Sequence, residues 1–576
     1  MHYRWRQILN PNSTTVDHLQ EKLGIDPALC TILAQRGIST FDEAKAWFRP
    51  QLSNLHDPFL MLNMDKAVAR INAAMESNER IMIYGDYDVD GTTAVSLVYS
   101  FLRKHYDNID TYIPDRYKEG YGISLAGIDY AEDNGITLII ALDCGIKAIK
   151  QVNYAKEKGI DFIICDHHRP GEFVPPAAAV LDPKQENCNY PFDELSGCGV
   201  GFKLVQGLCK DWNLPDTEWL PAMDLLAISI GADIVPIVGE NKILAHHGLK
   251  LINSKPRAGI QLLIELTGRK NKNLTITDVV FMIGPRINAA GRISHGRLAV
   301  DLLTGEDSKV IEELSQTIND HNTERKELDS NITISALEMI TEQNEVERRS
   351  TVVFDKTWHK GVIGIVASRL IETHYRPTVV FTESNGVLAG SARSVKGFDV
   401  YNALDQCSDV LEQFGGHMYA AGMTLKKERY EEFRQRFEEA VQSSILPEHL
   451  IPEIEVDCEV DFASLDFKFY RVLQQMAPFG PQNMTPTFIT NGLLDTGYSK
   501  VVGADQTHLR VVLKDPKTNI TLTGIGFGMA DKMDLIKSGK PLSVAYHLEE
   551  NEYNGNISLQ MRIKDVKLTE ELTTQE

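Results

Sequence analysis

The segment RIMIYGDYDVDGTT, residues 80–93, decides the fold of this chain. It begins with a short apolar run typical of a buried strand, continues through a turn that holds three aspartates, and ends in two threonines that can open a helix. Further apolar runs follow, with helix-like segments between them, at residues 109–113, 137–142, 162–164 and 178–181. This alternation predicts βαβ units and a mostly parallel sheet.

Carboxylates and imidazoles gather where these runs end. Three of the runs are followed by such residues, namely Asp86, Asp88, Asp90, Asp143, Asp166, His167 and His168. Asp233 ends a separate apolar segment. Because the carboxyl ends of parallel strands line one crevice, we expect these side chains to meet there. An aspartate after a strand often only caps the next helix. That explanation suffices for any single position but not for the whole set.

The donor types indicate which metal such a site would hold. Many carboxylates with one or two imidazoles and no thiolate form a hard-donor site suited to Mg²⁺ or Mn²⁺. Their mutual repulsion would be costly without a metal ion. Two ions about 3.5–4 Å apart would stabilise both the attacking hydroxide and the leaving oxygen in phosphoryl transfer.

The length of 576 residues predicts several domains rather than one core. Helical patterning dominates the start, the α/β pattern follows, a long charged helix comes next, and a second α/β segment precedes a β-rich end that fits a small barrel. The expected boundaries are residues 1–75, 76–305, 306–347, 348–447 and 448–576.

Charge and composition narrow the class of protein. With 59 basic and 80 acidic residues the net charge is −21, which argues against a protein that coats duplex DNA by bulk electrostatics. Any nucleic acid must therefore bind in a local basic groove. The eight cysteines form no zinc-type spacing, so reduced structural thiols are expected. No apolar run is long enough for a membrane span, so we expect a cytoplasmic protein that does not bind a membrane.

Taken together, the motifs at residues 85–91, 143–145, 166–168 and 232–233 resemble those of the DHH phosphoesterase superfamily. More narrowly, the chain resembles the RecJ family of single-strand-specific 5′→3′ exonucleases. Further similar segments are residues 112–116, 120–122, 195–200, 284–292, 358–369 and 415–422. The resemblance covers most of the chain in the family's order. It implies an α/β protein with a parallel-sheet DHH catalytic domain, a long linking helix, a smaller DHH-associated domain and a C-terminal OB-type barrel.

Carried over position by position, the resemblance implies five metal ligands: Asp88, Asp90, Asp143, His167 and Asp233. It implies two Mn²⁺ or Mg²⁺ ions, bridged by Asp90 and Asp143. His168 would lie beside the scissile phosphate, Asp166 would orient its neighbours, and Asp86 would complete the catalytic set. In one departure, Tyr84 stands where many members have a histidine ligand, which predicts a more weakly held ion.

Residues for binding DNA are implied in the same way. Arginine forks suit phosphate oxygens, and glycine-rich turns let backbone N–H groups approach them. Arg297 lies in the same glycine-containing stretch as Arg286, Asn288 and Arg292. Ser391 and Arg393 match the pocket for the 5′-terminal phosphate. The whole expected set is Arg116, Tyr121, Arg286, Asn288, Arg292, Ser391, Arg393, Gly416 and His417.

The function implied is removal of nucleotides from the 5′ end of single-stranded DNA in repair and recombination. The expected partners are single-stranded DNA, a helicase and a single-strand-binding protein, and the chain is expected to be a monomer. Two alternatives stay open. One is a DHH phosphodiesterase for short oligonucleotides or cyclic dinucleotides, although such enzymes are usually shorter and lack the barrel. The other is a non-catalytic replication scaffold, although that branch has lost metal ligands.

Overall fold

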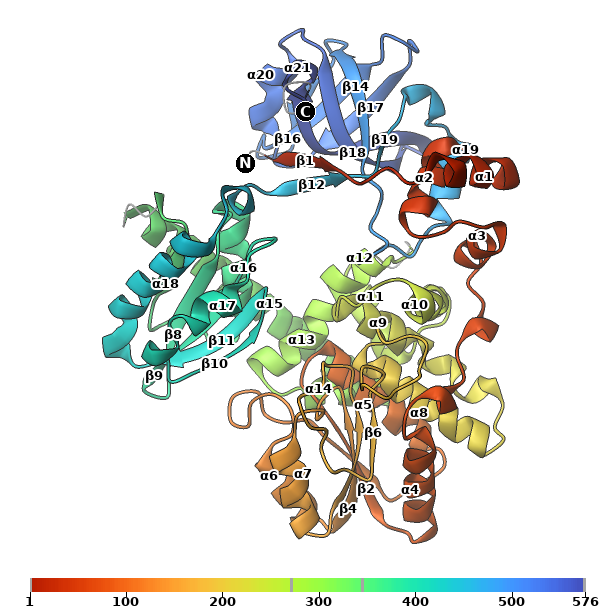
Figure 1. Cartoon of the computed structure of the whole chain (residues 1–576), viewed down its shortest axis with the longest axis vertical. Helices are drawn as coiled ribbons and strands as arrows, with labels where there is room; N and C mark the ends of the chain where they lie inside the picture. Colours follow the sequence, from red (N-terminus) through yellow and green to blue (C-terminus); the bar gives the residue numbers. More distant parts are fainter. Residues whose placement is uncertain (1–2, 270–272, 343–346, 573–576) are drawn as a thin grey trace. The chain divides into compact units, whose positions relative to one another are not determined.

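The structure, a computed structural model, describes residues 3–269, 273–342 and 347–572. They form two compact units, drawn in Figure 1. The parallel-sheet unit contains Pro50–Asn331 and the short segment Pro478–Asn483, and the composite unit contains Met1–Arg49, Ile332–Ala477 and Met484–Glu576. No helix in the described ranges is both long and apolar enough to cross a membrane.

A five-stranded sheet organises the parallel-sheet unit. All its pairings are parallel, in the order β3-β2-β4-β5-β6. The strands are β2 (Arg80–Gly85), β3 (Ile109–Tyr112), β4 (Ile136–Leu142), β5 (Asp161–Cys165) and β6 (Ala179–Leu181). Alternate side chains of β2 enter different cores, because Ile81 and Ile83 join one apolar cluster while Met82 and Tyr84 join the other. The predicted alternation of strands and helices is confirmed for this region.

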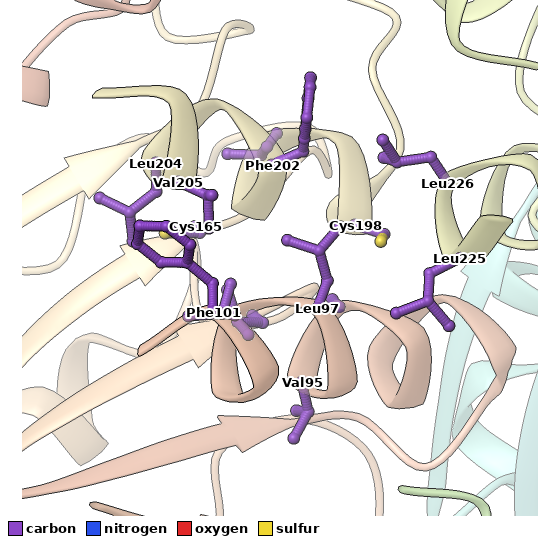
Figure 2. Packing of buried hydrophobic residues seen from close by; sticks show 14 of the residues in the cluster. Val95, Leu97, Phe101, Cys165, Cys198, Phe202, Leu204, Val205, Leu225 and Leu226 are labelled. Carbon is purple, nitrogen blue, oxygen red and sulfur yellow. The ribbon is translucent and has the colours of Figure 1, made fainter. Parts of the chain in front are cut away.

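Helices cover both faces of this sheet. The larger core holds α4 (Met64–Glu76), α5 (Val89–Leu102), α8 (Gly197–Asp211), α9 (Met223–Ala232) and α10 (Gly239–Ile252). The smaller core holds α6 (Leu125–Asp133) and α7 (Ile149–Glu157). The apolar helix α5 is buried over most of its length, and Figure 2 shows its Leu97 and Phe101 directed toward α8. This burial fixes the first turn of α5 directly after the carboxyl end of β2.

Shorter helices follow and lead to the predicted long helix. They are α11 (Ala258–Leu266), α12 (Ile276–Asp278), the π-helical turn η5 (Val279–Ile283), α13 (Gly284–Ile293) and α14 (Arg297–Thr304). The helix α15 (Ser308–Glu342) then runs for 35 residues, from the parallel-sheet unit into the composite unit. The end of the predicted linking segment, residues 343–346, lies outside the described residues.

The second α/β segment, in the composite unit, forms a five-stranded sheet in the order β10-β11-β9-β8-β7. Its strands are β7 (Thr351–Phe354), β8 (Thr378–Ser384), β9 (Val387–Arg393), β10 (Gln413–His417) and β11 (Ala420–Leu425). Its helices are α16 (Ile363–Thr373), α17 (Val400–Asp405) and α18 (Tyr430–Ser444). Only β7 and β8 pair in parallel, and the remaining neighbours are antiparallel.

The β-rich end is a barrel of the predicted kind. Its order is β13-β14-β18-β19-β17-β16-β15, and an additional β14–β16 pairing closes it. The strands are β13 (Cys458–Glu459), β14 (Phe488–Asp495), β15 (Lys500–Val502), β16 (His508–Lys514), β17 (Thr521–Gly526), β18 (Leu542–Tyr553) and β19 (Asn556–Leu568). A turn at Asn554-Gly555 joins β18 to β19, with φ of 52° and 75°.

The N-terminal region is less uniform than the predicted helical segment. It contains α1 (Ser13–Leu23), α2 (Pro27–Gln35) and α3 (Phe41–Phe48), but it begins with the strand β1 (Arg4–Gln7). That strand pairs in parallel with β12 (Glu453–Val456). The strand β1 was not predicted, because its partner β12 is far away in the sequence and leaves no local signal.

Candidate active site

The predicted acidic and imidazole side chains meet at the carboxyl edge of the parallel sheet. His167 Nε2 lies 3.3 Å from an Asp143 oxygen, 3.5 Å from Asp233 and 3.8 Å from Asp90. Asp143 follows β4, and His167 follows β5. Asp233 comes from a different kind of element, because the apolar segment before it is the helix α9 and Asp233 is its C-cap.

The close spacing of the first motif depends on two glycines. A Cβ at Gly91 would lie 2.4 Å from the Asp86 carbonyl oxygen, and one at Gly85 would lie 2.4 Å from a Val95 methyl. The first turn of α5 can therefore fold directly against the end of β2. Asp88 is the N-cap of α5 and accepts a hydrogen bond of 3.0 Å from the Gly91 N–H. Capping and membership of the acidic cluster thus coincide at this residue.

Asp90 is held by groups to which the sequence assigns no role. It accepts hydrogen bonds from the Gly197 N–H (2.6 Å), the Cys198 N–H (2.9 Å) and the Ser229 hydroxyl (2.6 Å). The first two belong to the start of α8, where unpaired N–H groups favour an anion. A Cβ at Gly197 would lie 2.5 Å from Asp143, so only glycine fits. The family-like segment at residues 195–200 could have indicated the two N–H donors from the sequence, whereas no sequence motif points to Ser229.

Buried atoms without partners show that the cluster fits a metal ion. In the described part of the chain, Asp143 Oδ1 and both ring nitrogens of His167 are buried without a hydrogen-bond partner. Burial and the neighbouring aspartate charges raise the pKa of Asp143 and Asp233 well above the usual range. Burial lowers the pKa of His167, which favours the neutral ring that binds metals. Oxygen and imidazole donors of this kind suit Mn²⁺ or Mg²⁺.

Two sets of ligand atoms are close enough to share an ion. The ligand atoms of Asp143, His167 and His168 lie within 4.8 Å of one another, and so do those of Asp90, His167 and Asp233. Asp86 and Asp88 lie on the turn between β2 and α5, four and two residues before Asp90, and burial with the charge of a neighbouring aspartate raises the pKa of both. The structure thus brings all the predicted acidic residues to one place.

Asp166 organises the turn that carries the two histidines. Its Oδ1 accepts hydrogen bonds from the N–H groups of His167 (2.8 Å) and His168 (3.1 Å) and lies 2.7 Å from His168 Nδ1, while Oδ2 accepts from the Ile146 N–H. Burial alone would raise the pKa of Asp166, but these hydrogen bonds lower it to about 2. Burial opposes protonation of His168, yet the ionised Asp166 raises the pKa of that histidine. The geometry fits the orienting role predicted for Asp166.

Tyr121 and Arg116 lie beside this turn. The Tyr121 hydroxyl is 3.1 Å from His168 Nε2, and the Tyr121 ring meets the rings of His168 and Tyr87 edge-on. The Arg116 guanidinium stacks 4.7 Å from the centre of the Tyr87 ring. More than half of Tyr121 is exposed, so an aromatic and a cationic side chain face solvent next to the acidic cluster.

Tyr84 is occupied by backbone contacts. Its hydroxyl donates to the Gly122 carbonyl (2.8 Å) and accepts from the Ser124 N–H (3.1 Å). Its ring is buried and stacks on Tyr112 at 5.4 Å. Tyr84 therefore anchors the loop that carries Tyr121.

Asp182 is a buried acid that the sequence reasoning missed. It follows β6, its Oδ2 has no hydrogen-bond partner in the described part of the chain, and burial raises its pKa to about 7. The strand at residues 178–181 was predicted, so the same rule of reading strand ends would have found it. The charge of Lys184, two residues on, adds to the effect of burial in lowering the pKa of His167, and it only partly opposes the rise in the pKa of Asp233.

The predicted basic stretch divides into buried and exposed members. Arg286 is buried and donates to the carbonyls of Met282 (2.6 Å) and Leu266 (3.3 Å) and to Asn319 Oδ1 (3.1 Å). This geometry supports a role in holding α13 to its neighbours. Asn288 and Arg292 are partly exposed on α13, and Arg297 is exposed at the start of α14.

The predicted phosphate pocket lies on one face of the second sheet. Strand register places Ser391, Gly422 and Gly415 in one row, and Arg393, Ala420 and His417 in the row beside it. Cβ atoms at Gly415 and Gly422 would meet nothing within 4 Å, so the surface beside Ser391 is open.

Arg393 and Ser391 also contact each other. Arg393 Nη1 donates to Ser391 Oγ at 3.1 Å, and a Cβ at Gly364, in the first turn of α16, would lie 2.8 Å from Arg393 Nη2. A helix start, a hydroxyl and a guanidinium therefore converge, which is suitable for an anion. Gly416 allows the β10–β11 hairpin to close, because a Cβ there would lie 2.3 Å from the Ala420 carbonyl oxygen.

Known proteins share this arrangement along the whole chain. Family profiles described as "DHH family, N-terminal domain", "DHHA1 domain" and "RecJ OB domain" match residues 80–230, 348–443 and 456–565. The single-stranded-DNA-specific exonuclease RecJ of Bacillus subtilis is 37% identical over 570 residues, which cover 98% of this chain and 71% of that protein. The chain belongs to the RecJ family.

Solved RecJ structures have the same fold. The crystal structure of RecJ in complex with Mn²⁺ from Thermus thermophilus gives a TM-score of 0.85 at 26% identity and covers 98% of this chain and 80% of its own. That of the same protein in complex with Mg²⁺ gives 0.78 at 24% identity, over 98% and 78%. The predicted α/β architecture, the OB-type barrel and the enzyme class, a metal-dependent DHH phosphoesterase of the RecJ type, are confirmed.

Proposed function

We propose that this RecJ-family chain removes nucleotides one at a time from the 5′ end of single-stranded DNA, in repair and recombination. The observation that carries the proposal is the cluster of Asp90, Asp143, His167 and Asp233 around buried atoms that lack partners. A helicase and a single-strand-binding protein are the partners we propose. The domain boundaries predicted from the sequence remain part of this proposal.

Five side chains would hold two ions: Asp88, Asp90, Asp143, His167 and Asp233. The resemblance to the RecJ family makes Asp90 and Asp143 the candidates for ligands that both ions would share, and each lies within 3.8 Å of His167 Nε2. Bound Mn²⁺ or Mg²⁺ would neutralise the acidic cluster and stabilise the charge that develops on a phosphodiester during hydrolysis. The start of α8 holds the Asp90 carboxylate in position through two N–H donors.

His168 is the candidate group for contact with the scissile phosphate. Asp166 binds its Nδ1 side, so Nε2 is the nitrogen directed toward Tyr121 and the open side of the site. An imidazole whose pKa is raised can hold a proton at Nε2 and donate it to a phosphate or leaving oxygen. Tyr121 and Arg116 would flank the strand at this point.

Polarity would come from the pocket at Ser391 and Arg393, which we propose binds the 5′-terminal phosphate. Arg393→Ala should slow digestion of 5′-phosphorylated strands about tenfold or more and 5′-hydroxyl strands less, because the lost contact is charge-assisted. Arg429→Ala is the matched control, since that guanidinium pairs with Glu432 on the surface of the same unit. Equal slowing of both substrates by Arg393→Ala would contradict the pocket.

The barrel offers a surface for the rest of the strand. Register aligns Lys500, Arg510 and Arg562 in one row across β15, β16, β17 and β19, and the Arg562 guanidinium lies 5.5 Å from the Phe527 ring centre. Cations interleaved with an exposed aromatic ring suit a single strand. Arg510→Glu with Arg562→Glu should weaken binding of long strands, whereas the exposed Lys537→Glu is the control.

Point variants test the barrel better than truncation near residue 450. Residues 478–483 belong to the parallel-sheet unit, where the Pro481 carbonyl accepts from the Ile237 N–H at 2.8 Å. Truncation would remove this segment and the partner of β1 together with the barrel.

The decisive experiment compares labelled DNA substrates in Mn²⁺, Mg²⁺ and EDTA. Linear single strands with a 5′ label should release labelled mononucleotide at once, 3′-labelled strands should shorten gradually, and EDTA should stop both reactions. Duplexes and circular strands should persist. Cleavage of circles would indicate an endonuclease, action on cyclic dinucleotides or very short oligonucleotides alone would favour the other DHH activity, and binding without cleavage would favour a scaffold.

A further inference from the structure

Ile234 adopts a backbone conformation that β-branched residues avoid. Its φ is +61°, in the left-handed region, where a branched Cβ crowds the backbone. Among the residues that the structure describes, the other nine non-glycine residues with positive φ are asparagine, aspartate or glutamine. Ile234 follows the C-cap of α9, a position at which glycine normally supplies this conformation.

The protein core does not compensate this strain. The Ile234 side chain is 65% exposed, whereas Val235 and Ile237 directly after it are buried. The chain on both sides is fixed, because the Asp233 N–H donates to the Ser229 carbonyl (2.9 Å) and the Ile237 N–H donates to the Pro481 carbonyl. A glycine at position 234 would therefore fit the same path with less strain.

The position of Ile234 indicates what its side chain could contact. Asp233 Oδ2 lies 3.5 Å from His167 Nε2, so the residue after it emerges at the edge of the acidic cluster. Strained residues persist where a function requires them. An exposed branched aliphatic side chain at the edge of a phosphodiesterase site can pack against the apolar face of a nucleobase.

We propose that Ile234 is a substrate-contacting residue, which packs against the base of the nucleotide next to the scissile phosphate. The inference rests on the proposed function, since it requires a nucleic-acid strand in the site. The residue would supply contact area without hydrogen-bond donors or acceptors, so it would favour no particular base. It would help to position an unpaired nucleotide for hydrolysis.

The test compares Ile234→Val, Ile234→Gly and Ile234→Asn. Valine keeps both the branch and the contact, so kcat/KM on single strands should stay within about twofold of wild type. Glycine and asparagine accept the left-handed backbone but lack the apolar branch. They should lower kcat/KM about tenfold through KM, the factor expected when one buried apolar contact is lost. Their urea midpoints should equal or exceed the wild-type value.

Three further measurements separate this role from a structural one. Mn²⁺ affinity, measured by calorimetry, should be unchanged in Ile234→Gly, because Asp233 keeps its position. Strands with abasic sites at the first nucleotides should be cut at similar rates by wild type and Ile234→Gly, because no base remains to be contacted. Asn213→Gly, at another positive-φ position of the same unit, controls for backbone flexibility and should leave activity unchanged.

Each contrary result overturns the inference. A wild-type value of kcat/KM in Ile234→Gly would show that the side chain does not contact the substrate. If Ile234→Gly loses as much kcat/KM on abasic strands as on normal strands, the side chain does not contact a base. A lower urea midpoint would mean that Ile234 packs against the protein, and weaker Mn²⁺ binding would mean that it acts through Asp233. A wild-type enzyme that fails to degrade single strands would instead refute the proposed function.

Discussion

Two buried charged regions of the parallel-sheet unit differ in how their charges are satisfied. Lys203 is fully buried, and its Nζ bonds to Glu240 (2.7 Å), to Gln206 (2.9 Å) and to the His56 carbonyl (3.2 Å). Glu240 also accepts from the Tyr190 hydroxyl (2.6 Å). The metal-ligand cluster, in contrast, brings several aspartates together around His167, whose two buried ring nitrogens have no hydrogen-bond partner among the described residues.

The difference shows which buried charges serve structure and which serve function. The Lys203–Glu240 pair is complete within the protein and holds the His56 backbone against α8 and α10. The acidic cluster is incomplete, because burying several carboxylates side by side costs free energy, and a bound cation offsets that cost while the carboxylates stay ionised. Ligand binding is therefore expected at the second region and not at the first.

The largest expected effect is on catalysis. Asp143→Asn and His167→Ala should each lower cleavage by about a thousandfold or more while leaving single-strand binding largely intact, because both remove ligands at the centre of the cluster. The exposed Asp107→Asn is the control. Metal-free Asp143→Asn should also be at least as stable as wild type, since one repelling charge is gone. Near-wild-type degradation by either variant would reject the metal-site assignment.

The paired region should respond in the opposite way. Glu240→Gln should lower the free energy of unfolding by about 3 kcal/mol, because it leaves Lys203 buried without its counter-ion. Cleavage per folded molecule should change little. Urea denaturation and activity below the transition measure both quantities. If the variant is as stable as wild type, the pair has no structural importance and the contrast between the two regions fails.

Variants of Tyr84 test whether this residue affects metal binding or only the packing beside the acidic cluster. The departure from the family's histidine predicts that Tyr84→His would lower the Mn²⁺ concentration needed for half-maximal rate, whereas the hydroxyl's contacts with Gly122 and Ser124 favour a packing role. We expect the packing role to decide the result. Tyr84→His should not lower the Mn²⁺ requirement, and Tyr84→Phe should cost about 1 kcal/mol of stability through the lost hydrogen bonds. A lower requirement in Tyr84→His would restore the metal explanation.

His547, a half-buried histidine in the barrel, extends the comparison to a group whose environment favours its neutral form. Burial, and then the charges of Lys564 and Arg562, lower the pKa of His547 to about 4. Below about pH 6.5, His547 binds a proton in the unfolded chain but stays neutral in the folded barrel. The free energy of unfolding is therefore highest above about pH 6.5 and falls as the pH is lowered toward 4. The loss should reach about 3 kcal/mol relative to His547→Gln. If the free energy of unfolding depends on pH in the same way in both proteins, the lowered pKa of His547 is contradicted.

The sequence predicts those parts of the fold and site that depend on local pattern. Strands with aspartates at their ends are visible in residues 80–182, and the structure brings the predicted acids together. Contacts between distant segments were not predictable. β1 pairs with β12, and Ser229 binds Asp90, yet neither partner carries a local signal. Arg286 looks like a DNA contact in its motif, whereas its hydrogen bonds to nearby carbonyls depend on how the helices pack.

Calorimetric titration of Mn²⁺ tests the central claim most directly, namely that the unpaired buried charges form a two-ion site. Wild type should bind two ions and Asp143→Asn should lose binding, while Glu240→Gln, measured below its unfolding transition, should bind as wild type does. Absence of binding to the wild-type protein, or unchanged binding to Asp143→Asn, would contradict the account.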